Sequence, residues 1–494
     1  MRTAGVIAAA LGFYWAGASG VALDLPQPAA EGVRADAGRP ARVSARRIDL
    51  ARAFQRFERA ALARDPQGEA LAELNRRVDA LAMMFLSGRM GQALEELDVL
   101  SAELLGLEDE AREAWLAAAS LRVRAYPSWI VSPEDDQLDL IIETLHGTDR
   151  RDRLHEAELV VTMPSSGISW EWPLKDRMDF RGTARAPFPV ELRKPGTADL
   201  WIRVPGTQPM HMGRLWMLEY GTLDVYREGL LREFSDPRLA PHRQVDVASV
   251  IAQMTDDQDA LVWLVDSPEA LVRTWRKELQ TPPEQVRLRP GHHRGVFRLG
   301  GASSPVIVFA PNQITEGTPL PLVIALHGAG GDEHLWIDGY GAGMLTDLAR
   351  EKGFIVASPL AYPLLGNGMM LDALLDDIAQ DFDFDRSRVY LIGHSMGAMG
   401  ASALAQMRPR TIAAVCAIAG AAPLQAGRAR APMLVFGAEH DRIVPPGRVE
   451  RQVRPAIDAG EAVEYRLVPH QGHTLIVPAV LPEAIDWLLG HRLE

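Results

Sequence analysis

The neighbours of one serine predict that it lies on a sharp turn between a strand and a helix. Ser395 follows the apolar run 389–392, which predicts a buried strand, and precedes residues 396–407, whose many small side chains predict a closely packed helix. A serine on such a turn projects its hydroxyl above the sheet, and the turn leaves no room for side chains two positions before and after it. Gly393 and Gly397 occupy those two positions. The pattern therefore predicts a nucleophile elbow at Ser395.

A serine hydroxyl is a weak nucleophile, so it needs a general base and a group that orients the base. Asp441 lies just after the apolar run 433–436, and His473 lies just after the run 463–468. Because the carboxyl ends of parallel strands meet at the same edge of a sheet, both side chains are expected at the edge that carries Ser395. We predict that His473 takes the serine proton and that Asp441 orients the imidazole ring.

Four further side chains are considered beside these three. Glu439, on the loop of the orienting aspartate, is an alternative orienter, and His470 is an alternative base. His327 and His394 flank the site, and we expect them to shape loops by hydrogen bonding rather than to act as bases.

Hydrolysis at a carbonyl also needs backbone N–H groups that bind the developing oxyanion. The glycine-rich segment 327–331 follows the apolar run 322–326, so it is expected to leave the sheet beside the elbow. We predict the N–H groups of Ala329 and Met396 as the two donors of an oxyanion hole, with Gly330 as the alternative to Ala329.

Residues 286–494 are expected to form an α/β domain with a mostly parallel sheet. Short apolar runs alternate there with helical stretches, a rhythm typical of a sheet covered on both sides. Besides the four runs already described, the β-prone runs of this part are 306–310, 354–357 and 412–418.

Regions of different character precede that domain. Residues 47–145 carry apolar residues at helical spacing, which predicts a helical bundle. Residues 150–285 hold short β-prone runs between Pro- and Gly-rich turns, followed by a helical tail, which predicts a β-rich, sandwich-like accessory region of antiparallel strands. Residues 23–46 are rich in Ala, Pro, Gly and charge without periodicity and are predicted to be a linker.

The first 22 residues have the pattern of a secretory signal peptide. Arg2 is followed by an uncharged stretch over residues 4–16 and then by small residues at Ala18, Gly20 and Ala22. We therefore expect a secreted or periplasmic protein, with an uncleaved N-terminal anchor as the alternative. No other segment approaches the roughly 18 apolar residues of a membrane span, so no stable membrane insertion is expected after cleavage.

Composition excludes several classes of function. Among 494 residues, 65 are acidic and 52 are basic, and the net charge of −13 repels phosphate backbones, so a nucleic-acid partner is not expected. Cys416 is the single cysteine, which excludes an internal disulfide and a cysteine-based zinc site. The cluster Met210-His211-Met212 is a weak candidate for a soft metal because further ligands are lacking. Neither a metal nor a cofactor is expected.

Tryptophans are concentrated in the β-rich region. They could form a platform on which sugars stack, which would make this region a carbohydrate-binding module. Core or interface packing is the commoner use of such side chains. The residues concerned are Trp170, Trp172, Trp201 and Trp216.

Together, these motifs resemble those of the α/β-hydrolase superfamily. The segment 319–331 with Gly393-His394-Ser395-Met396-Gly397 resembles the prolyl-oligopeptidase-like, dienelactone-hydrolase-like and polyhydroxybutyrate-depolymerase-like serine esterases, and the order serine, aspartate, histidine is the one this superfamily uses. The resemblance covers only the C-terminal part of the chain. It implies hydrolysis of an ester or peptide through an acyl-enzyme, without a cofactor.

The sequence therefore predicts a secreted serine hydrolase that cleaves carboxyl esters in a small-molecule or polymer substrate. A serine peptidase of prolyl-oligopeptidase-like type is one alternative, and a non-enzymatic envelope or binding protein that retains a hydrolase domain is another. The segment between Ser395 and Asp441 is too short to hold a large cap, so cover for the site is expected from residues 362–370 or from the preceding regions. The sequence carries no signal of oligomeric state.

Overall fold

A computed structural model describes residues 44–494, except for 127, 136–137, 165, 176, 178–182, 190–191, 255–267, 282–289, 300–301, 316 and 429. The predicted signal peptide (1–22) and most of the predicted linker (23–46) lie outside the described residues. None of the described helices is both long enough and apolar enough to cross a bilayer.

The first described part is a helical bundle that contains α2 (Arg47–Arg64), α3 (Gly68–Leu86), α4 (Met90–Leu104) and α5 (Asp109–Ala119). Apolar side chains three and four positions apart place one stripe of each helix on the inside. Phe57 of α2, Val78 of α3 and Leu97 of α4 belong to one buried cluster, which also includes Leu475 from the far end of the chain. The bundle therefore packs against the C-terminal part.

The predicted helical region 47–145 is too long. Helix α5 ends at Ala119, and strand β1 (Leu121–Tyr126) begins two residues later. Apolar Leu121, Val123 and Ala125 alternate with Arg122 and Arg124 in the sequence of this strand. This period of two is the signature of a strand, but the strand has only six residues, and a pattern so short is easily lost beside a long helical one.

The β-rich region has two sheets, with strand orders β1-β3-β6 and β2-β8-β7-β4-β5. Most neighbouring strands are antiparallel, as expected, but the short strand β2 pairs with β8 in parallel. Apart from β1, the strands are β2 (Ile130–Val131), β3 (Asp139–Thr144), β4 (Glu158–Met163), β5 (Ile168–Pro173), β6 (Thr183–Pro187), β7 (Gly196–Arg203) and β8 (Met210–Met217), and a 3₁₀ helix, η1 (Thr148–Glu156), precedes β4.

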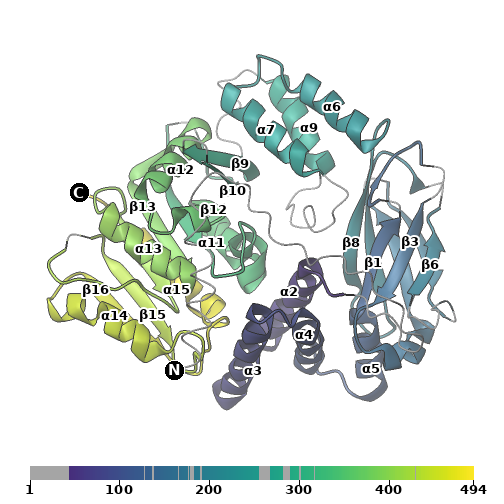
Figure 1. Ribbon diagram of the computed structural model, residues 1–494, viewed down its shortest axis with the longest axis horizontal. Coiled ribbons are helices and arrows are strands. Elements are labelled where there is room, and N and C mark those ends of the chain that lie inside the picture. Colours follow the sequence, from purple (N-terminus) through teal and green to yellow (C-terminus); the bar gives the residue numbers. More distant parts are fainter. Residues whose placement is uncertain are drawn as a thin grey trace.

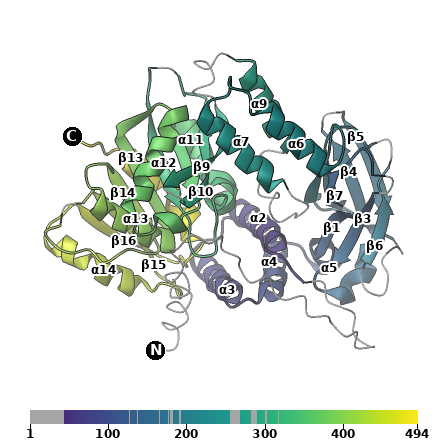
Figure 2. The ribbon, with the colours of Figure 1, turned by 45° about the horizontal axis from the view of Figure 1, so that its top comes forward.

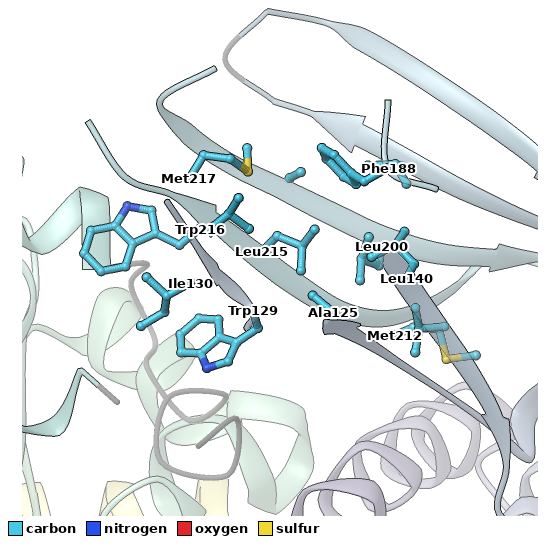
Figure 3. Close-up of a cluster of buried hydrophobic side chains, with 14 of the residues drawn as sticks. Ala125, Trp129, Ile130, Leu140, Phe188, Leu200, Met212, Leu215, Trp216 and Met217 are labelled. Atoms are coloured by element: carbon cyan, nitrogen blue, oxygen red, sulfur yellow. The ribbon is translucent and has the colours of Figure 1, made fainter. Parts of the chain in front are cut away.

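Side chains from both sheets meet in one apolar core, shown in Figure 3. Trp216 is 1% exposed and contributes to this core, so it cannot offer a face to a sugar. Met210 and Met212 are also buried there, while His211 between them is exposed and bonds to Asp199 at 3.2 Å. Because the two sulfurs and the imidazole lie on opposite faces of β8, they do not form a shared metal site.

The part of the chain that the structure describes after the β-rich region includes α6 (Leu223–Glu233), α7 (Pro241–Gln253) and α9 (Pro268–Leu279). In both views they lie on the opposite side of the molecule from α2–α4 (Figures 1 and 2). His242 of α7 contacts Asp381 of the α/β domain at 2.9 Å, so these helices also connect the accessory and C-terminal parts.

The C-terminal part is an α/β domain built on an eight-stranded sheet with the order β16-β15-β14-β13-β11-β12-β10-β9. The strands from β16 to β12 in this order run parallel, while β10 is antiparallel to both of its neighbours. The strands are β9 (Gly291–Leu299), β10 (Ala302–Ala310), β11 (Leu320–Leu326), β12 (Ile355–Pro359), β13 (Phe384–His394), β14 (Ala414–Ile418), β15 (Met433–Ala438) and β16 (Val463–Val468). The predicted fold class is confirmed.

Helices cover both faces of this sheet. Apolar residues of α12, α13 and α14 pack in the core of one face, and those of α11 and α15 pack in the core of the other. The helical segments are η3 (Leu335–Gly339), η4 (Tyr340–Gly343), α11 (Met344–Lys352), η5 (Tyr362–Leu364), α12 (Gly368–Asp381), α13 (Met396–Met407), α14 (Pro446–Asp458) and α15 (Ile476–Leu489).

Figure 1 shows α2–α4 between the α/β domain and the β-rich region, and Figure 2 shows the same arrangement from a second direction. Hydrogen bonds from Arg47 and to Asp79 connect the bundle to the loops that follow β11, β15 and β16, which carry part of the predicted site.

A substitution at Leu475 measures how much the packing against α2–α4 contributes to stability. Leu475→Ala removes a side chain that is 6% exposed and packed among α2–α4, and we expect it to lower the free energy of unfolding by about 2–4 kcal/mol. Urea unfolding followed by circular dichroism measures the change. Leu467→Ala, on a strand position that is 52% exposed, is the matched control and should change the free energy by less than about 0.5 kcal/mol. Equal effects of the two variants would contradict the packing described here.

Candidate active site

Ser395 lies at the tight turn between β13 and α13 that the sequence predicts. Its backbone is strained, with φ 56° and ψ −116°, and its N–H donates to the Ile418 carbonyl at 2.9 Å. A Cβ on Gly393 would lie 2.3 Å from the Gly397 oxygen, and a Cβ on Gly397 would lie 2.0 Å from the Leu326 oxygen. Since real Cβ atoms do not approach oxygens this closely, both positions require glycine.

His473 and Asp441 meet Ser395 at the carboxyl edge of the sheet. The His473 Nε2 atom lies 2.9 Å from the Ser395 Oγ atom, and its Nδ1 atom lies 2.7 Å from the Asp441 Oδ2 atom. The other carboxylate oxygen of Asp441 accepts the backbone N–H groups of Ile443 at 2.8 Å and Val444 at 2.7 Å. Both the imidazole and the carboxylate are buried, so the carboxylate is held in one orientation and is shielded from water.

The two alternatives from the sequence lie elsewhere. Glu439 accepts the backbone N–H of His470 at 2.8 Å, and both residues are exposed. Neither makes a hydrogen bond to Ser395 or His473 among the bonds of the described residues. The structure thus brings together Ser395, His473 and Asp441, and it uses Glu439 and His470 to connect two neighbouring loops.

The flanking histidines have structural partners. His394 Nε2–H donates to the His473 carbonyl at 2.8 Å, and its Nδ1 atom contacts the Tyr340 hydroxyl at 2.6 Å. His327 accepts the Ala361 N–H at 2.9 Å. Burial lowers the pKa of both rings, so they remain neutral and hold loops in place.

The loop after β11 passes beside the elbow. A Cβ on Gly328 would lie 3.4 Å from the Ser395 Cβ atom. The Gly330 N–H donates to the Tyr362 hydroxyl at 2.9 Å, so this donor already has a partner. That bond favours Ala329 over Gly330 as the first oxyanion donor, alongside Met396 at the start of α13. It also connects Tyr362, in the segment 362–370 from which the sequence predicts cover for the site, to the loop after β11.

Helices α2 and α3 also reach the loops of the site. Arg47 of α2 donates to the Gly330 carbonyl at 2.7 Å and to Asp332 at 3.1 Å. A Cβ on Gly330 would lie 2.5 Å from the ring of Phe85 on α3, so this part of the loop after β11 lies directly against the helix. Sequence reasoning did not identify Arg47 or Phe85, because nothing local relates a helix to a loop so far away in the chain.

Asp79 of α3 is the closest link between the bundle and the three central side chains. Its Oδ1 atom accepts the backbone N–H of His473 at 2.8 Å, and its Oδ2 atom accepts the backbone N–H of Arg442 at 3.2 Å. Asn75, one helical turn earlier, donates to the His470 carbonyl at 3.0 Å. A polar pair four residues apart within a core-facing helix was the only signal of this contact in the sequence.

Burial raises the pKa of the Asp79 carboxyl from 3.8 to about 6. The N–H of Arg442 and the proximity of His473 lower it, whereas the negative charge of Asp441 raises it further. Desolvation is the largest cause, since the side chain is almost completely enclosed between α3 and the two loops.

One surface group has the ligand types of a transition-metal site. Glu439, His440 and His470 place one ligand atom each within 4.8 Å of one another. The carboxylate of Glu439 already accepts the backbone N–H of His470. Imidazole and carboxylate would suit a metal such as zinc, with water completing the coordination.

Comparison with known proteins finds similarity over part of the chain. No family model matches the chain. A curated protein, the bifunctional acetylxylan esterase/xylanase XynS20E of Neocallimastix patriciarum, is 27% identical over 157 residues, which are 28% of this chain and 21% of that protein. The chain thus spans about a fifth of the length of this relative.

Solved structures with a similar fold carry related names. FphF, a fluorophosphonate-binding serine hydrolase of Staphylococcus aureus, matches 41% of this chain and 99% of its own at 14% identity and a TM-score of 0.35. An S-formylglutathione hydrolase of Agrobacterium tumefaciens matches 42% and 98% at 19% identity and a TM-score of 0.36. A thermostable esterase matches 76% and 99% at 15% identity and a TM-score of 0.38. The expected resemblance to α/β-hydrolase serine esterases is confirmed for part of the chain.

Gly397 tests the close approach at the elbow. Gly397→Ala places a methyl group 2.0 Å from the Leu326 carbonyl oxygen, so α13 must shift, and we expect the free energy of unfolding to fall by more than about 2 kcal/mol. Gly91→Ala, at a helical position with open space around it, is the matched control and should leave stability unchanged or slightly higher. Chemical denaturation of both variants measures this. Full stability of Gly397→Ala would contradict the geometry.

Asp79→Asn tests the raised carboxyl pKa. Because the folded pKa of about 6 lies above the unfolded value near 3.8, the folded protein binds this proton more tightly. The wild type therefore loses this contribution to stability as the pH rises through about 6, and the variant does not. We expect the Tm of the variant, relative to the wild type, to be higher at about pH 8 than at about pH 4. A relative Tm independent of pH would show that the pKa of Asp79 is unshifted.

Proposed function

We propose that this protein is a serine hydrolase that cleaves carboxyl esters through an acyl-enzyme on Ser395. The observation that carries the proposal is the continuous chain of hydrogen bonds from Ser395 through His473 to the buried Asp441. A hydroxyl, an imidazole and a carboxylate in this order form the arrangement that activates serine in hydrolases on unrelated folds.

In the proposed mechanism, His473 Nε2 takes the proton of the Ser395 hydroxyl as the Oγ atom attacks the ester carbonyl carbon. The N–H groups of Ala329 and Met396 bind the resulting oxyanion. Asp441 accepts the Nδ1–H of the ring, fixes its tautomer and stabilises the imidazolium.

Collapse of the tetrahedral intermediate breaks the bond to the leaving alcohol, which receives the proton from His473. Water then attacks the acyl-enzyme in the same way, with His473 again as the base. The carboxylic acid leaves, and the Ser395 hydroxyl is restored. These reaction steps require no cofactor.

Ester hydrolysis is favoured over peptide hydrolysis because the curated relative is named as an acetylxylan esterase. The substrate class is a small-molecule or polymer ester. Secretion or export to the periplasm is part of the proposal and rests on the signal-like residues 1–22. The peptidase and the non-enzymatic binding protein remain the alternatives that the experiment must exclude.

The experiment compares the full chain with Ser395→Ala on nitrophenyl esters and on aminoacyl nitroanilides. We expect the wild type to cleave the esters, and Ser395→Ala to lose on the order of 10⁴-fold or more in kcat/KM. Ser166→Ala, at an exposed turn of the β-rich region, is the matched control and should keep full activity. Preference for the nitroanilides would favour the peptidase. No turnover, with no labelling of Ser395 by a fluorophosphonate, would favour the binding protein.

A further inference from the structure

We propose that Asp79, on helix α3 of the N-terminal bundle, is a positioning residue for ester hydrolysis. Its carboxylate holds the loop of the orienting aspartate and the loop of the base in a fixed relation to each other. The inference rests on the proposed function, because its effect is read through the activity of Ser395.

The two oxygens of one carboxylate bond to two different loops. Oδ1 accepts the N–H of His473 itself at 2.8 Å, and Oδ2 accepts the N–H of Arg442, the residue after Asp441, at 3.2 Å. The side chains of Asp441 and His473 extend from the same short backbone segments. A shift of either segment would therefore change the distance from Asp441 to the ring, or from the ring to the serine. Displacements near 1 Å can reduce rates about 100-fold.

The packing around Asp79 leaves little freedom for that displacement. Asp79 is 1% exposed, so water cannot readily replace it as the acceptor of the two N–H groups. A Cβ on Gly472 would lie 2.9 Å from the Oδ1 atom, which means that the backbone just before His473 lies directly against the carboxylate. The absence of a side chain at position 472 allows α3 to approach this closely.

Asn75 provides a contrast on the same face of α3. Its amide donates to the His470 carbonyl at 3.0 Å and to the Gln471 side chain at 3.3 Å. These bonds attach the helix to the start of the histidine loop, but none goes to His473 or to the aspartate loop. If α3 served only to attach the bundle to this loop, substitutions of Asn75 and of Asp79 would have similar effects on activity.

The cost of burying Asp79 also indicates a role beyond attachment. Burial disfavours the ionised carboxyl, and so does the neighbouring charge of Asp441. Among the charged and titratable groups that act on Asp79, His473 has the opposite effect and lowers the pKa of the carboxyl. A group that burial makes costly, next to an ionisable pair, is a common feature of functional sites. In ionised form it adds negative charge near the imidazolium that forms during the reaction.

The experiment measures steady-state hydrolysis of nitrophenyl acetate by four full-length proteins: wild type, Asp79→Asn, Asn75→Ala and Glu73→Gln. Asn at position 79 has one acceptor oxygen, so it can keep only one of the two N–H bonds. We expect its kcat to fall about 10- to 100-fold with KM changed by less than about threefold, since the substrate does not touch Asp79. Asn75→Ala should lower kcat by less than about threefold.

Glu73→Gln is the matched control, because Glu73 is an exposed carboxylate on the same helix whose partner is Arg76. It should leave kcat, KM and Tm unchanged. All assays are run at a temperature at which circular dichroism shows each variant to be folded.

Three results would overturn the inference. Asp79→Asn could retain kcat within about twofold of the wild type, or both buried variants could lose activity in proportion to their loss in Tm. Failure of Asp79→Asn to fold at any temperature would place this residue in the folding core rather than in the site. An inactive wild type that fluorophosphonate does not label would instead refute the proposed function, so the two failures are distinguishable.

Discussion

The close contact between the backbones of α13 and β11 is the constraint on which the site depends. Gly397 lies so near the Leu326 carbonyl that no Cβ fits between them, and Ser395 adopts a positive φ as the chain reverses there. This backbone strain fixes the serine above the sheet before any other side chain is considered. The parallel register of the strands then determines where the loops that carry the other two side chains emerge. Every later feature of the site, including the bundle contacts, is built around that position.

Local rules explain how much of the site could be predicted. The elbow glycines, the serine, and an aspartate and a histidine just after β-prone runs are each visible within ten residues of sequence, and parallel strands bring such positions to one edge. Only the structure distinguishes Asp441 from Glu439 as the orienting group, and His473 from His470 as the base, because both members of each pair lie on the same loop. The start of the β-rich region at Leu121 was missed because six residues of alternation are weak beside a long helical pattern. Asp79 and Arg47 were missed because a contact across most of the chain leaves no trace in local spacing.

The N-terminal regions are joined to the α/β domain by buried polar contacts as well as by apolar packing. Asp49 of α2 bonds to Arg122 of β1 at 3.0 Å, which connects the bundle to the β-rich region. On the far side, Asp246 of α7 accepts the N–H of Val296 on β9 at 3.0 Å. Buried polar pairs of this kind require specific geometry, so they favour one arrangement of the parts over many. The bundle is thus part of the architecture around Ser395 rather than a separate module on a tether.

The contact between α3 and the histidine loop also has a consequence for how the chain matures. Asp79 and His473 are 394 residues apart, and a ribosome releases the helix long before the loop exists. Until then the buried face of α3, with its aspartate and asparagine, has no partner and stays in water. The contacts of α3 with the C-terminal part therefore cannot form until β16 and the loop after it have been synthesised. A nascent or truncated chain without β16 and this loop has an incomplete site. Closing so long a loop is slow, so the contact between α3 and the histidine loop is expected to form late in folding.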